Sequence, residues 1–195
     1  STSNTIEDKR KSEQHDFILC YGSKPLTVTM LWESIKESFP DDIERLFAYQ
    51  KYNWLFGSES AEPWFFDGFG SPPYRVNRNG VIRYGAAGRL SVNEISNYIY
   101  FLDQFRRPQR ILGLQQPEFI GNSSIGAIWE DFDIVSDCQI FTLSFDHQDF
   151  VVYVFPSAQQ TWGYHTETGW WFELGTDARY FMGAHARAYD KNFVG

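Results

Sequence analysis

The sequence predicts an α+β protein in which a single domain spans residues 17–195. In the first half of the chain, large apolar residues recur three and four positions apart, which is the spacing of one helix face. From about residue 118 the pattern changes to short apolar runs separated by turn residues, as in strands. Helices that are segregated from an antiparallel meander are typical of the α+β class. We therefore expect a strongly twisted antiparallel sheet, mostly in the C-terminal half, packed against N-terminal and central helices.

The N-terminal part is expected to begin as a tail and then to become helical. Residues 1–16 are polar and charged, which predicts a disordered tail, and residues 17–21 form an apolar run typical of a buried strand. The first predicted helix has its apolar face at Val28, Leu31, Trp32, Ile35 and Phe39. A second helix is predicted to begin after Pro40, because two aspartates there favour a helix N-terminus, and to extend to about Trp54.

The middle of the chain is expected to contain a loop, a hairpin and a third helix. Residues 57–73 hold glycine and proline breakers among aromatic rings, which predicts a loop. Asn79-Gly80 between two apolar runs predicts a tight hairpin over residues 74–84. Gly85-Ala86-Ala87-Gly88 lacks the lysine and the spacing of a phosphate loop, so it is interpreted as a connection. The capping-box pattern Ser91-Val92-Asn93-Glu94 predicts a helix with core positions at Val92, Ile95, Ile99 and Leu102.

The C-terminal part is expected to form the sheet. Apolar runs separated by polar turns predict three strands, at residues 127–135, 139–145 and 150–155. A hairpin is expected next, formed by residues 161–165 and 169–174. A short helix over residues 177–189 is expected to close the chain.

Composition and charge restrict the classes of partner. The chain has 195 residues, a formal net charge of −8 and 18% aromatic residues. Nucleic acids and anionic membranes are disfavoured because their binding depends on Lys and Arg. No apolar run approaches the length of a membrane span. The four histidines lack the spacing of a local metal pair, so we expect no metal and no cofactor. A protein with a basic surface, or a neutral ligand, suits this charge.

Two sets of polar residues are candidates for acid–base chemistry. His165 lies among aromatic residues two positions before Glu167, where a histidine can serve as a general base. Asp131 and Asp133 would share one face of a strand with Trp129, which resembles the paired carboxylates of glycosidases. The alternative interpretation is that all four are ordinary hairpin or surface residues.

Aromatic residues supply the candidates for partner binding. Trp170 and Trp171 are adjacent, so in a strand they must point to opposite faces, and one can enter the core while the other faces outward. An exposed tryptophan with acidic neighbours can anchor a protein partner. The alternative is that most of these rings pack the core. The candidate partner-binding residues are Trp162, Tyr164, Trp170 and Trp171, together with Trp64 and Phe66 of the predicted loop.

The compartment and the oligomeric state are left open by the sequence. Cys20 and Cys138 both lie in apolar strand-like settings, which favours two buried thiols, although a disulfide is the alternative. A cytoplasmic location is slightly favoured. The glycosylation sequon Asn122-Ser123-Ser124 keeps secretion open.

Two function hypotheses follow. The first is a non-enzymatic protein-binding module that uses an acidic, aromatic surface to engage a basic partner, as an immunity or inhibitor protein would. The second is an enzyme or binding protein for a neutral, carbohydrate-like ligand. The order of Trp32-x-x-Ile35 before Phe39-Pro40-Asp41, and of Phe119-Ile120-Gly121-Asn122 before a strand, is similar to the SMI1/KNR4-type immunity fold. This resemblance implies an immunity role, but the aromatic C-terminal end departs from it, and it does not by itself assign the chain to that family.

Overall fold

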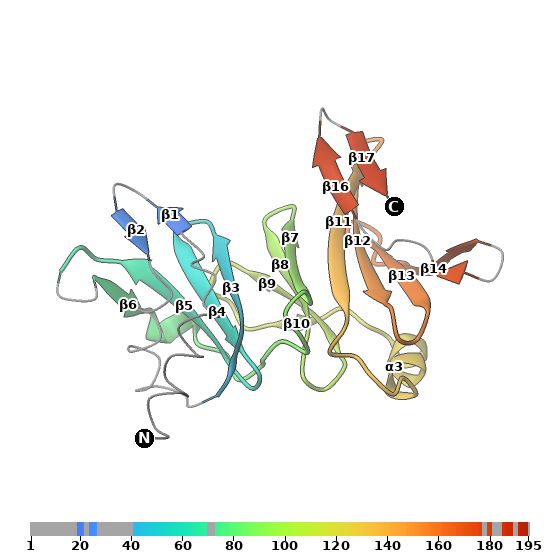
Figure 1. Cartoon of the computed structure of the whole chain (residues 1–195), viewed down its shortest axis with the longest axis horizontal. Helices are drawn as coiled ribbons and strands as arrows, with labels where there is room; N and C mark the ends of the chain where they lie inside the picture. Colours follow the sequence, from blue (N-terminus) through green and yellow to red (C-terminus); the bar gives the residue numbers. More distant parts are fainter. Residues whose placement is uncertain are drawn as a thin grey trace, which may run out of the picture. The chain divides into compact units, whose positions relative to one another are not determined.

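The protein is mostly β. The computed structural model describes residues 19–21, 24–26, 41–69, 73–176, 179–180, 185–188 and 191–194. Within these ranges, three antiparallel sheets of four or five strands follow one another along the chain (Figure 1). The same ranges contain a single α-helix, α3 (Ser123–Glu130), and one 3-10 turn, η1 (Arg78–Gly80). The predicted α+β class, with N-terminal and central helices packed on a sheet, is therefore wrong.

Contacts divide the chain into two units, residues 1–40 with 67–74, and residues 41–66 with 75–195. In the first unit, β1 (Leu19–Tyr21) pairs antiparallel with β2 (Lys24–Leu26). β1 confirms the strand predicted at residues 17–21 for the part that is described. The predicted tail over residues 1–16 and the predicted helix with its face at Val28 to Phe39 lie outside the described residues.

The first large sheet replaces the predicted second helix and the predicted aromatic loop. All six residues of β4 are buried, so both faces of this strand are covered. A strand covered on both faces does not show the alternation of apolar and polar residues that would have identified it. The predicted hairpin over residues 74–84 is also wrong, because Asn79-Gly80 forms η1, and β6 and Ile82 both bond to β5 and not to each other. The strand order is β3 (Ile43–Tyr49), β4 (Tyr52–Gly57), β5 (Ala61–Phe66) and β6 (Tyr74–Val76).

The second sheet replaces the predicted third helix. Ser96 and Asn97 both have positive φ, and they form a tight turn between two strands where the helix was expected to continue. The Ser91 hydroxyl bonds Gly88 across a turn and caps no helix. The apolar spacing from Val92 to Leu102 fits a helix face and two short strands equally well, and cross-strand packing decides between them. The strands are β7 (Val92–Ile95), β8 (Tyr98–Leu102), β9 (Pro108–Leu112) and β10 (Glu118–Phe119), in the order β10-β9-β8-β7.

The third sheet confirms the predicted meander. The strand predicted over residues 127–135 is wrong, because α3 and the turn after it occupy that segment. The helix predicted over residues 177–189 is wrong wherever that segment is described, since its described residues are strands. The sheet contains β11 (Gln139–Phe145), β12 (Gln148–Phe155), β13 (Gln160–His165), β14 (Trp171–Thr176) and β15 (Arg179–Tyr180). A separate antiparallel pair is formed by β16 (His185–Ala188) and β17 (Lys191–Val194).

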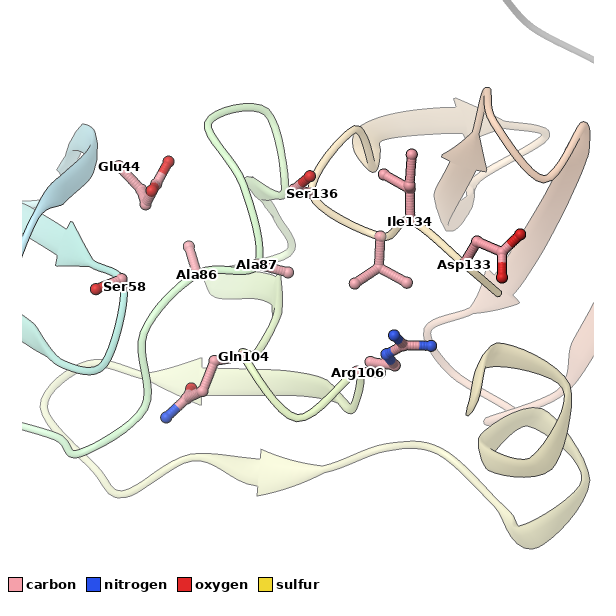
Figure 2. Close-up of a pocket in the computed structure, with 10 residues that line it drawn as sticks. Glu44, Ser58, Ala86, Ala87, Gln104, Arg106, Asp133, Ile134 and Ser136 are labelled. Carbon is pink, nitrogen blue, oxygen red and sulfur yellow. The ribbon is translucent and has the colours of Figure 1, made fainter. Parts of the chain in front are cut away.

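The segment Gly85-Ala86-Ala87-Gly88 passes close to the backbone of Ser58 at one end and of Ser136 at the other. Neither end has room for a side chain. A Cβ atom on Gly85 would lie 2.2 Å from the backbone of Ser58, and one on Gly88 would lie 2.0 Å from the Ser136 carbonyl oxygen. Figure 2 shows Ala86 and Ala87 on this segment, between Ser58 on one side and Ser136 on the other. The glycines therefore allow a close backbone approach, which agrees with a connecting role and not with a phosphate loop.

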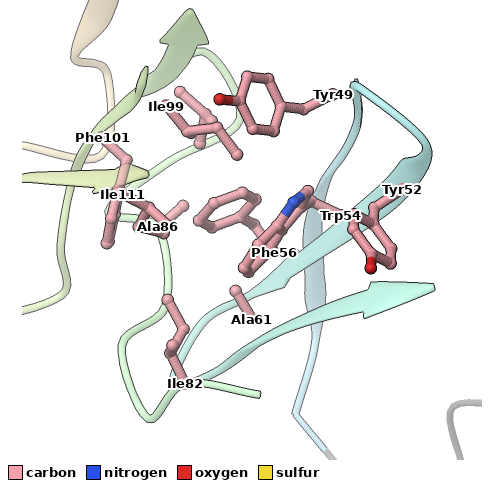
Figure 3. Close-up of a cluster of buried hydrophobic side chains, with 11 residues drawn as sticks. Tyr49, Tyr52, Trp54, Phe56, Ala61, Ile82, Ala86, Ile99, Phe101 and Ile111 are labelled. Carbon is pink, nitrogen blue, oxygen red and sulfur yellow. The ribbon is translucent and has the colours of Figure 1, made fainter. Parts of the chain in front are cut away.

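Two buried clusters share the second sheet. In β8, Ile99 and Phe101 belong to the first cluster, in which Phe56 packs on Phe101 with ring centroids 5.3 Å apart (Figure 3). Tyr100 and Leu102 of the same strand belong to the second cluster. The first cluster joins β8 to β4 and β5, and the second joins it to α3 and the third sheet. The second sheet is therefore buried on both faces.

Candidate functional site

One end of the third sheet brings two hairpin turns together. The β11–β12 turn contains Asp146 and His147, both with positive φ, and the β13–β14 turn spans Thr166 to Gly169. In an antiparallel meander, these two turns lie at the same end of the sheet. The Thr166 backbone N–H and its hydroxyl both donate to the Asp149 carbonyl at 3.0 Å, which ties the second turn to β12.

An aromatic row lies on one face of this end. We define the aromatic face as Phe145, Phe150, His165, Trp170 and Phe172. Phe150 pairs with His165 across the strands, and the backbone N–H of His165 donates to the backbone carbonyl of Trp170 at 2.9 Å. Since side chains alternate along a strand and cross-strand partners share a face, these five side chains point the same way.

Close packing fixes the centre of the aromatic face. The rings of Phe150 and His165 lie 4.9 Å apart, and those of Phe150 and Phe172 lie 6.1 Å apart at an interplanar angle of 84°. Phe172 lies over Gly163, where a Cβ atom would come within 2.5 Å of its ring. At the edges, Phe145 and Trp170 are each 74% exposed. The two most exposed rings therefore belong to opposite edges of the face, at β11 and next to β14, whose backbones are three strand spacings or about 14 Å apart.

His165 is the buried polar member of this face. It is only 8% exposed, and its Nδ1 lies 2.6 Å from the Thr168 hydroxyl oxygen. Its Nε2 is buried and has no hydrogen-bond partner in the part of the chain that the structure describes. Glu167 is exposed in the turn, and no hydrogen bond joins it to His165 among the described residues. The sequence prediction of a histidine within an aromatic hairpin is confirmed, whereas its role as a base stays a prediction.

The opposite face of the sheet holds the other aromatic candidates. Trp171 packs in the second buried cluster, with its ring 4.9 Å from Tyr164 and 5.4 Å from Trp129. Its indole N–H donates to the Ile120 carbonyl at 2.9 Å. Trp162 is half-buried against the same cluster. The expected split of the adjacent pair is confirmed, with Trp171 inside and Trp170 outside.

The two candidates of the first sheet lie elsewhere and differ from each other. Trp64 is buried, and its indole N–H donates to Glu62 at 3.2 Å. Phe66 is exposed at the end of β5. Burial raises the pKa of the Glu62 carboxyl, and the Trp64 hydrogen bond opposes that shift only partly.

The four candidate catalytic residues are not gathered into one site. Asp131 and Asp133 follow α3 and are exposed, and Trp129 is fully buried, so the three do not share a strand face. α3 packs on the opposite face of the third sheet from His165, where Trp129 contacts Tyr153, Phe155 and Trp171. His165 shares the other face with its cross-strand partner Phe150.

Sequence reasoning missed two electrostatic features. Between Ile111 and Thr176 lie nine of the 25 acidic residues and none of the 17 basic ones. This absence of Lys and Arg is visible in the sequence alone. The second feature is Arg106, whose guanidinium donates to carbonyls at the C-terminal end of α3, including that of Glu130 at 2.8 Å. It compensates the negative end of the helix.

Burial perturbs several titratable groups of the second cluster. Desolvation raises the pKa of Tyr100 to about 12, although Arg110 nearby opposes the shift. The pKa of Tyr153 and that of the free, fully buried Cys138 thiol are also raised, mainly by desolvation. In all three groups, burial therefore favours the protonated form.

The cavity in Figure 2 is shallow and does not coincide with the aromatic face. It has a volume of about 380 Å³ and is lined by Ala86, Ala87, Ile134 and polar side chains that include Glu44 and Arg106. Asp133 is the one candidate site residue on its wall. Arg106 points its Nη1 group at the carbonyls that end α3, which fixes the orientation of its guanidinium.

Comparison with known proteins finds no family model and no curated protein that matches this chain. The similarity to SMI1/KNR4-type proteins therefore receives no support from the family comparison. Among the described residues, no group of His, Cys, Asp or Glu has the arrangement of a metal site. None of the helices in those same ranges is both long and apolar enough to span a bilayer.

Proposed function

We propose that this chain is a non-enzymatic protein-binding module and that its aromatic face engages a basic partner. The observation that carries the proposal is the exposure of Trp170 and Phe145, at 74% each, beside turns that carry Glu167 and Asp146. Exposed tryptophan is enriched among the residues that dominate protein interfaces. If the basic partner is a toxin, the module is an immunity protein, as the first sequence hypothesis states.

Charge supports a basic partner over an acidic one. The whole segment from Ile111 to Thr176 lacks Lys and Arg, so exposed carboxylates around the third sheet have no cation from that segment. The one salt bridge recorded among the described residues joins Glu118 to Arg110, at 2.8 Å. A potential of one sign steers an oppositely charged partner and repels an acidic one.

The proposal is tested by selecting binders from a random peptide library displayed on phage. We expect selected peptides to be enriched in Arg and Lys, and their binding to weaken as the salt concentration rises. The variant Trp170→Ala should lose at least about 30-fold in affinity, as at an interface hot spot. Phe105→Ala is the matched control, because Phe105 is an exposed ring outside the aromatic face.

Two results would contradict the proposal. One is the selection of peptides without basic enrichment. The other is equal binding by Trp170→Ala and by the parent protein. Specific binding of neutral oligosaccharides in place of peptides would favour the second sequence hypothesis.

A further inference from the structure

We propose that the aromatic face is selective for arginine, with a guanidinium stacked on Trp170 and paired with Glu167. This inference rests on the proposed function and names the group that the basic partner presents. The arginine would bind at the β14 end of the face, where the two rings are those of Trp170 and Phe172. Trp170 and Phe172 are two residues apart on one face, so their Cα atoms are separated by about 6.8 Å.

These two rings offer a platform that is partly fixed before binding. Phe172 lies over Gly163 and meets the Phe150 ring edge-on, so its position is set by packing. Trp170 follows Gly169, whose φ of +72° reverses the chain and whose N–H donates to the His165 carbonyl at 2.9 Å. The turn therefore holds the tryptophan backbone while its side chain stays open to solvent.

A carboxylate lies in the same turn. Glu167 is three residues before Trp170 and is exposed. Within the described ranges, no Lys or Arg forms an ion pair with it. The second acidic turn residue, Asp146, is also exposed and lies at the same end of the sheet. A cation above Trp170 would therefore meet a negative group on the turn side and an aromatic surface below.

This arrangement suits a guanidinium better than an ammonium ion. The guanidinium is planar, weakly hydrated and able to stack on an indole while it donates two hydrogen bonds to one carboxylate. The lysine ammonium is a compact, strongly hydrated charge that gains less from an open aromatic surface. We expect arginine to be preferred over lysine by about fivefold or more.

The test uses two synthetic peptides that differ only in their cations. Each has three basic residues separated by glycines, with arginine in one peptide and lysine in the other. Titrations are followed by the indole N–H signal of Trp170 in NMR spectra, which is assigned from its loss in Trp170→Leu. We expect the arginine peptide to bind at least about fivefold more tightly and to shift the Trp170 signal.

Variants separate the two contacts. Glu167→Gln keeps the size of the side chain and should abolish most of the arginine preference, whereas Trp170→Leu should abolish binding of both peptides. The control Phe105→Leu should bind as the parent does. Because both site residues are exposed, the variants should fold, which the dispersion of their NMR spectra checks.

The outcomes distinguish the inference from the proposed function. Equal affinity for the two peptides, or an arginine preference that survives Glu167→Gln, overturns the arginine inference and leaves the protein-binding proposal standing. Binding of neither peptide up to millimolar concentration also overturns it. If the phage selection shows no basic enrichment either, the proposed function fails as well.

Discussion

The β4–β5 hairpin and the β13–β14 hairpin contain similar aromatic residues but use them differently. In the first, Trp54 and Trp64 point to opposite faces and both are buried, so the hairpin is covered on two sides. In the second, Trp171 is half-buried against Tyr164 and Trp129, whereas Trp170 is largely exposed. A high aromatic content therefore does not by itself indicate a binding surface. What matters is whether both faces of the strand are covered.

The two regions also differ in charge. Residues 41–110 contain eight acidic and nine basic residues, whereas residues 111–176 contain nine acidic residues and no basic one. Cations for local charge pairing are therefore present along the first two sheets, whereas after Arg110 the next one in the sequence is Arg179 of β15. Aromatic residues pack the core in both regions, and our proposal adds a recognition role only to the last.

The largest expected effect contrasts a buried tryptophan with an exposed one. Trp129→Ala removes a ring that contacts Tyr153, Phe155 and Trp171, and it should lower the free energy of unfolding by about 3–5 kcal/mol. Trp170→Ala should change it by no more than about 0.5 kcal/mol. Urea denaturation followed by circular dichroism measures both values. Similar losses in the two variants would show that Trp170 is part of the core.

A second contrast compares two glycines. Gly88→Ala places a Cβ atom against the Ser136 backbone and should lower the free energy of unfolding by about 1–3 kcal/mol. Gly126→Ala, on α3 with no atom within 4 Å of the new Cβ, should raise it by about 0.5–1 kcal/mol. Thermal unfolding of the two variants tests the prediction. A stable Gly88→Ala protein would contradict the close approach of the two backbones.

The smallest expected effect concerns alkaline pH. The pKa of Tyr100 is raised to about 12 in the folded protein, so above pH ~10 the unfolded chain loses this proton first. Tyr100 therefore stabilises the fold below pH ~10 relative to higher pH, and this contribution declines between pH ~10 and ~12. Tyr100→Phe should show a weaker decline in unfolding free energy between pH 9 and 11. An unchanged slope would contradict the proposed burial of the phenol.

The sequence predicted the third sheet well because its strands have clear boundaries. Polar residues from Asp146 to Asp149 separate two apolar runs, and the structure places the β11–β12 turn there. The adjacent tryptophans of the next hairpin also predicted that their two rings point to opposite faces of the sheet. The aromatic face could therefore be partly predicted, although its Phe145, Phe150 and Phe172 members were missed because cross-strand register is not visible in a single strand.

The helices were mispredicted for identifiable physical reasons. Strands such as β4 and β8 are buried on both faces, so their sequences carry continuous apolar residues that also satisfy a helical spacing. The strand predicted over residues 127–135 overlaps the second half of α3, which is short and contains isoleucines and a glycine that lower helix propensity. Asn122, which accepts a hydrogen bond from the Ile125 N–H at 2.9 Å, was the available start signal.

The position of β8 has a consequence for how the molecule unfolds. Its five residues supply Ile99 and Phe101 to one cluster and Tyr100 and Leu102 to the other. Loss of β8 from the sheet would expose both buried clusters to solvent at the same time. Residues 41–66 and 75–176 should therefore melt in one cooperative transition, with amides of β8 among the slowest to exchange with solvent.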